Sequence, residues 1–491
     1  MQAWNKKPLG LLSLSAIAVF ASLAYLLSVP HYNSNRQQPH STSSSKHRPF
    51  KAPQPNVWVE LDAVEAAQVY HFLRESPHGL PFLKEQTRSG KPLAVIGPIE
   101  VLRPNKSDVL DYLDNHGRTP DRWAQVQTLE SSDDDAYLVN YMVGPLPTSN
   151  DTQILPLEYC HNSGRNYVHS PVSDVFELLD WALNIGEDVA DITQDLLGAT
   201  VNRKDPADPG ALVVGSRPAL IENGRIVHWL EFFRAGIPSD GRSLLPQGLY
   251  VKLETPSPDP SRWETSEWYY NDIIYPNISA FRQAWSSSDF QKLRLNLNGP
   301  WTDTEDFGST VSERSKPAPL SIQPHGGRYS LDREQKYISW MGFTFYLMTS
   351  QSTALSLFDI RFNNERIIYH LGLQEALAHY AGSEPLQSGL EFLDSFFGMG
   401  VTMFSLVPGH DCPAYADYLD FSYRRGEHTF TNKNAICVFE YTSDAPLQRH
   451  TSATSVTVSR NTYLVVRSVS TVGNYDYTVS AWSGRRINTD G

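Results

Sequence analysis

The sequence predicts two small α+β domains followed by a large antiparallel β domain. Between residues 57 and 270, stretches with apolar residues at helical spacing alternate with short extended stretches. From about residue 319 onward, runs of β-branched and aromatic residues are separated by turn signals. The length of 491 residues suffices for about three or four compact units, so it accommodates this arrangement.

The composition excludes several classes of protein. With 40% hydrophobic and 19% charged residues, the chain is neither disordered nor fibrous. The 41 basic and 54 acidic residues give a net charge of −13, which argues against a nucleic-acid-binding protein. Three cysteines are too few for a disulfide-dense scaffold or a four-cysteine zinc site.

The N-terminus carries an apolar segment. Lys6 and Lys7 precede the 21 uncharged residues 9–29, which in a helix reach about 31 Å, enough to cross a bilayer. This pattern predicts a signal-anchor and a single-pass type II membrane protein that faces the lumen or exterior. A cleaved signal peptide and secretion are the alternative, because alanines such as Ala21 and Ala24 supply small residues for a cleavage site.

A polar stretch and three glycosylation patterns agree with this compartment. Residues 30–56 are rich in Ser, His, Gln and Pro and predict a flexible stalk. Asn105, Asn150 and Asn277 each begin an Asn-x-Ser/Thr acceptor pattern. A single such pattern is common by chance, but behind a secretory segment all three are expected to be exposed to glycosylation.

The first small domain is predicted over residues 57–150 and the second over 151–270. Asp62 and Glu65 form a capping-box pattern that begins a helix, in which Val64, Val69, Phe72 and Leu73 are expected to face the core. Further elements of the two domains are predicted as helices after Ser107 and over 174–183, and as strands over 93–96, 136–142, 211–214 and 225–233.

Residues 271–318 are predicted to be a linker and 319–491 the β domain. Asn363-Asn364 suits a tight hairpin turn between two of its strands. Its strands are predicted over 335–347, 354–362, 366–371, 435–441, 455–459 and 462–469.

The segment Thr471-Val472-Gly473-Asn474-Tyr475-Asp476-Tyr477 resembles the cofactor motif of the copper-containing amine oxidases. Tyrosines that alternate along a strand are ordinary, so the motif alone means little. Other family-like segments precede it in the family's order, however: Gln323-Pro324, Arg328-Tyr329, Trp340–Phe343, Ser356–Arg361, Gln374–Tyr380, Leu393–Ser395, Phe397–Gly400 and Gly409–Pro413. The resemblance implies N2-like and N3-like α+β domains and a β-sandwich catalytic domain that is incomplete at the C-terminus.

The resemblance assigns roles to four residues. Tyr475 matches the tyrosine that is oxidised to topaquinone, whose carbonyl forms a Schiff base with a primary amine. Asp394 matches the catalytic base, the proton acceptor, although a turn cap is the ordinary interpretation of an aspartate. Tyr380 matches a tyrosine that hydrogen-bonds the quinone, although a core tyrosine is equally ordinary. Asn474 matches a residue that positions the quinone.

The residues around Asp394 suggest why it could act as a base. Leu393, Phe396 and Phe397 are apolar neighbours in the sequence, and they are expected to desolvate the carboxylate and raise its pKa. The resemblance also implies a disulfide between Cys412 and Cys437, which suits an oxidising compartment. Cys160 is left over and is expected to be an inert thiol.

The copper ligands of the family have no match in this sequence. The family uses a His-x-His pair after the cofactor tyrosine and a later third histidine, but no His-x-His occurs and no histidine follows His450. Because residues 481–491 also depart from the family pattern, a C-terminally truncated member is expected.

Two functions are therefore considered. One is oxidative deamination of a small primary amine with O2 by a homodimer that carries topaquinone and copper. The alternative is a catalytically inactive, truncated membrane glycoprotein of the same family. The sequence does not identify the amine.

Overall fold

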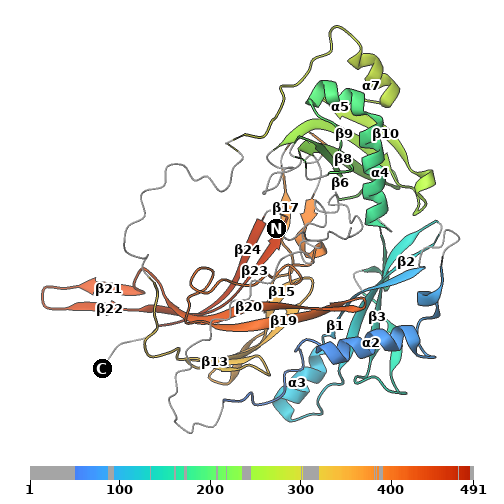
Figure 1. Ribbon diagram of the computed structural model, residues 1–491. Helices are drawn as coiled ribbons and strands as arrows, with labels where there is room; N and C mark the ends of the chain where they lie inside the picture. The colour runs from blue at the N-terminus through green and yellow to red at the C-terminus, as the bar shows by residue number, and fades with distance from the viewer. Residues whose placement is uncertain are drawn as a thin grey trace, which may run out of the picture.

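The computed structural model describes residues 50–486 apart from 87–92, 133, 160–161, 171–173, 206–207, 209, 217, 235–244, 300, 302–319, 381, 383, 386–390 and 474. In this part of the chain antiparallel strands predominate, and five α-helices accompany them. Figure 1 shows the helices in two groups, each lying against a sheet of its own unit.

The first unit packs helices on an antiparallel sheet. Helix α2 (Ala63–Glu75) begins with the predicted capping box, because Asp62 accepts hydrogen bonds from the amides of Val64 and Glu65 and Glu65 bonds the Asp62 amide in return. Val69 and Leu73 are fully buried, but Val64 is 65% exposed. Val64 lies about 140° around the helix from Val69, so it falls outside the buried face. The other elements are η2 (Pro81–Lys84), β1 (Ala94–Leu102), α3 (Lys106–Asn115), β2 (Trp123–Ser131), β3 (Ala136–Gly144), β4 (Gln153–Pro156) and β5 (Tyr167–His169).

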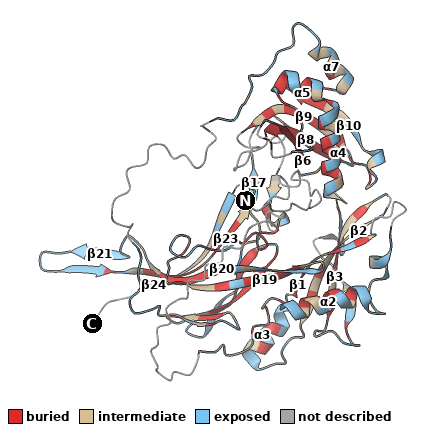
Figure 2. Cartoon of the chain, in the orientation of Figure 1, coloured by how far each residue is buried: buried red, intermediate tan, exposed pale blue. Residues whose placement is uncertain are grey.

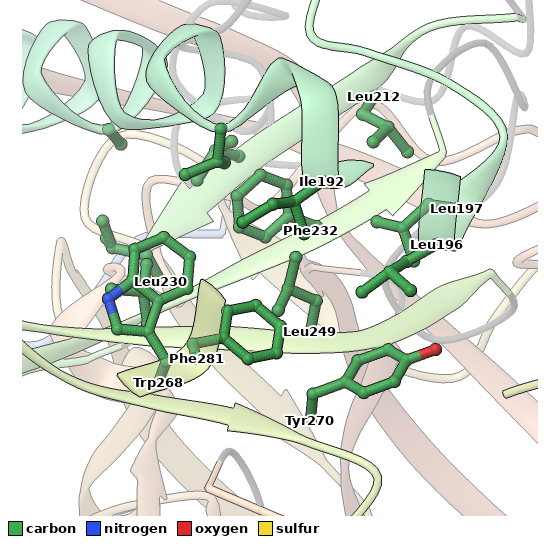
Figure 3. Packing of buried hydrophobic residues seen from close by; sticks show 14 of the residues in the cluster. Ile192, Leu196, Leu197, Leu212, Leu230, Phe232, Leu249, Trp268, Tyr270 and Phe281 are labelled. Atoms are coloured by element: carbon green, nitrogen blue, oxygen red, sulfur yellow. The ribbon is translucent and has the colours of Figure 1, made fainter. Parts of the chain in front are cut away.

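The sheet and helices of the second unit enclose an aromatic core of their own (Figure 3). Trp268, Tyr270 and Phe281 are almost completely buried there, and Ile192 and Leu196 close the core from the helix side. Its sheet has the order β11-β10-β9-β8-β6, with β7 paired to β8. The elements are α4 (Val175–Asp188), α5 (Ala190–Leu197), β6 (Leu212–Ser216), β7 (Leu220–Glu222), β8 (Arg225–Arg234), β9 (Pro246–Glu254), η4 (Pro260–Arg262), β10 (Glu264–Tyr270), β11 (Ile273–Tyr275) and α7 (Ile278–Trp285).

One nine-stranded sheet joins the first unit to the C-terminal strands. Its order is β24-β23-β20-β19-β1-β2-β3-β4, with β5 paired to β3. The connection is made where Pro98 and Ile99 of β1 pair with Arg425 and Arg424 of β19. The C-terminal strands of this sheet are β19 (Asp417–Arg425), β20 (His428–Thr442), β23 (Asn461–Val472) and β24 (Tyr475–Arg486).

A second sheet packs on the C-terminal strands and completes a β-sandwich. Ile338, Trp340 and Leu347 of this sheet share a core with Ile436 and Val466 of the nine-stranded sheet, and Figure 2 shows the buried inner strands in red. The predicted architecture of α+β units followed by a β-sandwich is therefore confirmed. The strands of this second sheet are β12 (Ser330–Asp332), β13 (Tyr337–Trp340), β14 (Phe343–Ser350), β15 (Ala354–Phe362) and β16 (Glu365–Gly372).

Two tight turns organise the second sheet. The predicted hairpin turn at Asn363-Asn364 is confirmed, because both residues have positive φ angles (48° and 67°) and Phe362 pairs with Glu365. The strand predicted over 335–347 is instead broken into β13 and β14. Met341 and Gly342, with φ angles of 50° and 89°, form a second hairpin turn between them.

An exposed hairpin and the segment that precedes α2 lie outside these two sheets. The hairpin β21 (Gln448–Thr451) and β22 (Val456–Ser459) forms a separate, almost fully exposed arm (Figures 1 and 2). Residues 50–56, the end of the predicted stalk, lie against the second sheet, where the Asn56 side-chain amide donates a hydrogen bond to the Leu347 carbonyl (3.0 Å).

The prediction of a single-pass type II membrane protein is corrected here. No helix in the described part of the chain is long and apolar enough to span a bilayer. The segment on which the prediction relied, residues 9–29, lies outside the described residues, as do residues 30–49 of the predicted stalk.

Candidate active site

A tight hairpin positions Tyr475 at the start of β24. Val472, the last residue of β23, pairs with Tyr475 across a two-residue turn. Gly473 has φ = 61° in this turn, a conformation that glycine adopts without steric cost. Because side chains alternate along a strand, Tyr475 and Tyr477 lie on the same face. Their ring centroids are 6.3 Å apart, and Tyr475 is 44% exposed.

Asp394 lies on a short turn that is held by two small strands. β17 (Leu377–His379) pairs with β18 (Glu391–Leu393), and the 3-10 turn η6 (Asp394–Phe396) follows directly. The Asp394 amide donates to the Ala376 carbonyl (3.0 Å), which fixes the start of the turn. The Asp394 residue is only 5% exposed.

A single phenol, that of Tyr477, lies between Asp394 and Tyr475. Tyr477 donates a hydrogen bond to Oδ2 of Asp394, and its ring lies beside that of Tyr475. On the other side, the hydroxyls of Tyr475 and Tyr380 are hydrogen-bonded to each other. The ring of Tyr380 meets the ring of Phe392 edge to face, with centroids 5.8 Å apart. The structure thus brings together Tyr380, Tyr475 and Asp394.

Burial dominates the electrostatics of the aspartate. Desolvation raises the pKa of Asp394; the hydrogen bond from Tyr477 acts in the opposite direction, and the charge of Glu375 raises the pKa further. Leu393 and Phe396, which were expected to desolvate Asp394, are 48% and 72% exposed. The expected direction is therefore correct. Phe397, the third expected neighbour, is half-buried and packs against the core cluster that contains Met399 and Phe421.

Sequence reasoning missed two residues of this site. Tyr477 was part of the motif but received no role, although its two-residue spacing from Tyr475 is the signal that places both on one face. Glu375 accepts hydrogen bonds from the amides of Ala376 (2.8 Å) and Ser395 (2.9 Å) and from the Ser395 hydroxyl. Nothing in the sequence pattern indicates that Glu375 contacts the turn of Asp394.

The remaining candidate residues lie in several places. Cys412 and Cys437 form a disulfide. Asn105, Asn150 and Asn277 are exposed, and their glycosylation stays a prediction. The Asn277 side chain also caps α7, because it accepts a hydrogen bond from the Ala280 amide (2.9 Å). Asn474 and Cys160 lie outside the described residues.

The residues present fit topaquinone better than copper. A cofactor made from the Tyr475 side chain would need no further binding pocket, and its ring already lies beside Tyr477 and contacts Tyr380. By contrast, the described residues contain no group of three or more His, Cys, Asp or Glu side chains that could hold a metal ion.

Comparison with protein families matches two segments of the chain. Residues 331–483 match "Copper amine oxidase, enzyme domain". Residues 241–309 match a domain of unknown function, DUF1965. The first match contains Tyr380, Asp394, Tyr475 and Tyr477.

Whole-chain comparisons give relatives of the same kind. The chain is 36% identical over 447 residues to the copper amine oxidase vicK1 of Bipolaris victoriae, covering 90% of this chain and 61% of the relative. It is 28% identical to amine oxidase [copper-containing] 2 of Homo sapiens, covering 96% and 61%. The chain thus spans about three fifths of the length of these curated relatives.

Solved structures give a matching result. The crystal structure of Aspergillus nidulans amine oxidase superposes with a TM-score of 0.80 at 39% identity, covering 89% of this chain and 58% of that one. The Pichia pastoris lysyl oxidase superposes with a TM-score of 0.79 at 29% identity, covering 90% and 60%.

Proposed function

Because the chain belongs to the copper amine oxidase family, we propose that it oxidises primary amines, with Asp394 as the catalytic base and Tyr475 as the precursor of topaquinone. The observation that carries this proposal is that a buried carboxylate and an accessible phenol lie on either side of one tyrosine, Tyr477. The net reaction converts a primary amine, O2 and water into an aldehyde, ammonia and hydrogen peroxide.

Tyr475 would carry the topaquinone, and that group would provide an electrophilic carbonyl for the amine nitrogen. Asp394 removes a proton from the α-carbon of the bound amine. Burial suits it to this task, because a carboxylate with a raised pKa binds a proton more tightly than an ordinary aspartate does. Tyr380 holds the side chain at 475 by the hydrogen bond between their hydroxyls.

The partners follow from the same family membership. The substrates are a small primary amine and O2, and Asn474 is assigned to position the quinone. The homodimer is a further part of the proposal, and the exposed β21–β22 arm offers a surface for it. The alternative of an inactive membrane glycoprotein draws no support from the relatives or from the described residues.

Quinone staining of the purified chain tests the proposal. Purified from its natural source, the wild-type chain should stain for a redox-cycling quinone and release peroxide when benzylamine is added. Tyr475→Phe should lose both signals because it lacks the hydroxyl from which the quinone forms. Tyr441→Phe is a matched control, since Tyr441 donates to Asp444 (3.2 Å) at an exposed site. A wild-type chain that neither stains nor releases peroxide would refute the proposal.

A further inference from the structure

Two residues contact Asp394 or its turn without any role in the mechanism above. Tyr477 reaches the carboxylate from β24, and Glu375 reaches the following residue, Ser395, from the segment before β17. The two approach from elements that are almost 100 residues apart in the chain. Tyr477 pairs with Ser470 through its backbone, while its side chain contacts Asp394.

We propose that Tyr477 and Glu375 are a pair of positioning residues that act on Asp394 in opposite ways: Tyr477 by a hydrogen bond that favours the carboxylate, and Glu375 by fixing the turn and placing a second negative charge beside it. This inference rests on the proposed function of Asp394 as the base. The proton affinity of Asp394 then depends on the opposing effects of Tyr477 and Glu375.

Tyr477 is suited to stabilise the charged form of Asp394. Its ring packs on the core cluster that contains Met399 and Phe421, which holds the phenol in place. Burial and the neighbouring Asp394 both raise the pKa of Tyr477, so the phenol stays protonated and remains a donor at neutral pH. A phenol has one proton to donate, and Tyr477 donates it to Asp394.

Glu375 is suited to act in the opposite direction. Both of its carboxylate oxygens are used: Oε1 accepts from the amides of Ala376 and Ser395, and Oε2 accepts from the Ser395 hydroxyl. These hydrogen bonds tie the segment before β17 to the turn that carries Asp394. They also keep Glu375 close enough for its charge to disfavour ionisation of Asp394.

The other titratable groups of the site are phenols. Tyr475 on β24 and Tyr380 after β17 both lie within reach of Tyr477 and raise its pKa further. Among the described residues, the charge identified as acting on Asp394 is that of Glu375, and its hydrogen-bonding phenol is Tyr477. Removal of each side chain should therefore have a distinct and opposite effect.

Carbon-13 NMR of the full chain labelled at aspartate carboxyls tests the inference without any need for the cofactor. The Asp394 signal is assigned by its loss in Asp394→Asn. Tyr477→Phe should raise the titration midpoint of this carboxyl by about one pH unit, because a hydrogen bond to the charged form is lost. Glu375→Gln should lower it by about half a pH unit, because the glutamine keeps the size of the side chain but not its charge.

Matched variants exclude general effects. Tyr141→Phe removes a phenol that donates to Glu130 (2.8 Å) in the first unit, and Glu365→Gln removes a charge on β16; both should leave the Asp394 midpoint unchanged. Thermal unfolding verifies that each variant is folded. If Tyr477→Phe does not fold, Glu375→Gln still tests the Glu375 half of the pair, and an unchanged Asp394 midpoint in that variant overturns the proposal.

The outcomes separate this inference from the proposed function. Opposite shifts of the Asp394 midpoint, with parallel shifts of the acidic limb of kcat/KM, would support the inference. Unchanged midpoints, shifts in the same direction, or an acidic limb that does not follow the carboxyl would overturn it. Failure of the proposed function would be seen separately, as absence of peroxide from the wild-type chain.

Discussion

Two clusters of acidic residues in this protein show how the partners of a carboxylate decide its use. Asp114 on α3 and Asp359 on β15 are bridged by Arg361 and Arg366, with N–O distances of 2.5–2.9 Å. Arg366 and Arg361 lower the pKa of Asp114 to about 2. Asp394 instead has a neutral phenol and a second carboxylate as its partners, and its pKa is raised.

The comparison distinguishes Asp114, a carboxylate that contributes to stability, from Asp394, a carboxylate that accepts a proton more readily. Guanidinium groups stabilise the charge of Asp114 so well that it has little affinity for a proton. Asp394 is buried without such a cation in its described surroundings, so it holds a proton more readily. The contrast predicts which substitution affects catalysis and which affects stability.

The largest expected effect is on amine oxidation. If Asp394 is the base, as proposed, Asp394→Asn should reduce kcat/KM by about 10²–10⁴-fold, because it removes the proton acceptor while keeping the size of the side chain. Peroxide release measures this loss. Asp114→Asn, the matched change in the arginine cluster, should retain nearly full activity, and a similar loss in both variants would break the comparison.

A substitution in the arginine cluster should instead change the stability of the protein. Asp114→Asn should lower the free energy of unfolding at neutral pH by about 1 kcal/mol, a value reduced for the partial exposure of Asp114. A folded pKa below the unfolded value gives stability that is present above about pH 4 and is lost as the pH falls through about 2. Urea unfolding at several pH values should therefore show wild type and variant converging in acid. A constant difference at every pH would contradict this.

Asp394 should show the opposite pH dependence. Its raised pKa gives stability that is fully present below the unfolded value, near 3.8, and is lost as the pH rises through the folded value. Relative to Asp394→Asn, the wild-type chain should lose stability over this interval. The same urea titrations measure this difference in the free energy of unfolding. If the wild-type chain instead became more stable relative to Asp394→Asn as the pH rose, the carboxylate would not be desolvated.

The smallest effect concerns the apolar neighbours of the base. Phe396→Ala should change the free energy of unfolding by less than about 0.5 kcal/mol, because Phe396 is 72% exposed. It should also leave the pKa of Asp394 unchanged. A lowered pKa in this variant, measured by carboxyl NMR, would show that Phe396 helps to bury the base after all.

Much of the fold could be predicted from local patterns. The capping box at Asp62 and the hairpin at Asn363-Asn364 are determined by adjacent residues, and both are present. The strand predicted over 335–347 was wrong because Met341 is an unusual residue for a left-handed turn conformation. The continuous sheet through β1 and β19 depends on residues far apart in sequence, which no local pattern encodes.

The candidate site, too, could be predicted from the sequence only in part. Tyr380, Asp394 and Tyr475 were found through motif resemblance, and the structure places them together. Tyr477 could have been found from strand alternation. Glu375 could not, because its role depends on how the segment before β17 folds against the turn of Asp394. The direction of the pKa shift of Asp394 was predicted correctly. Two of the three neighbours to which it was assigned, Leu393 and Phe396, are nevertheless exposed, because adjacency in sequence does not report burial.

The pairing of β1 with β19 has a consequence for synthesis of the protein. Ile99 emerges from the ribosome long before its partner Arg424 has been translated. During that interval β1 presents an unsatisfied edge, which other chains could use for pairing. The sheet of the first unit is therefore complete only after the C-terminal strands have been translated.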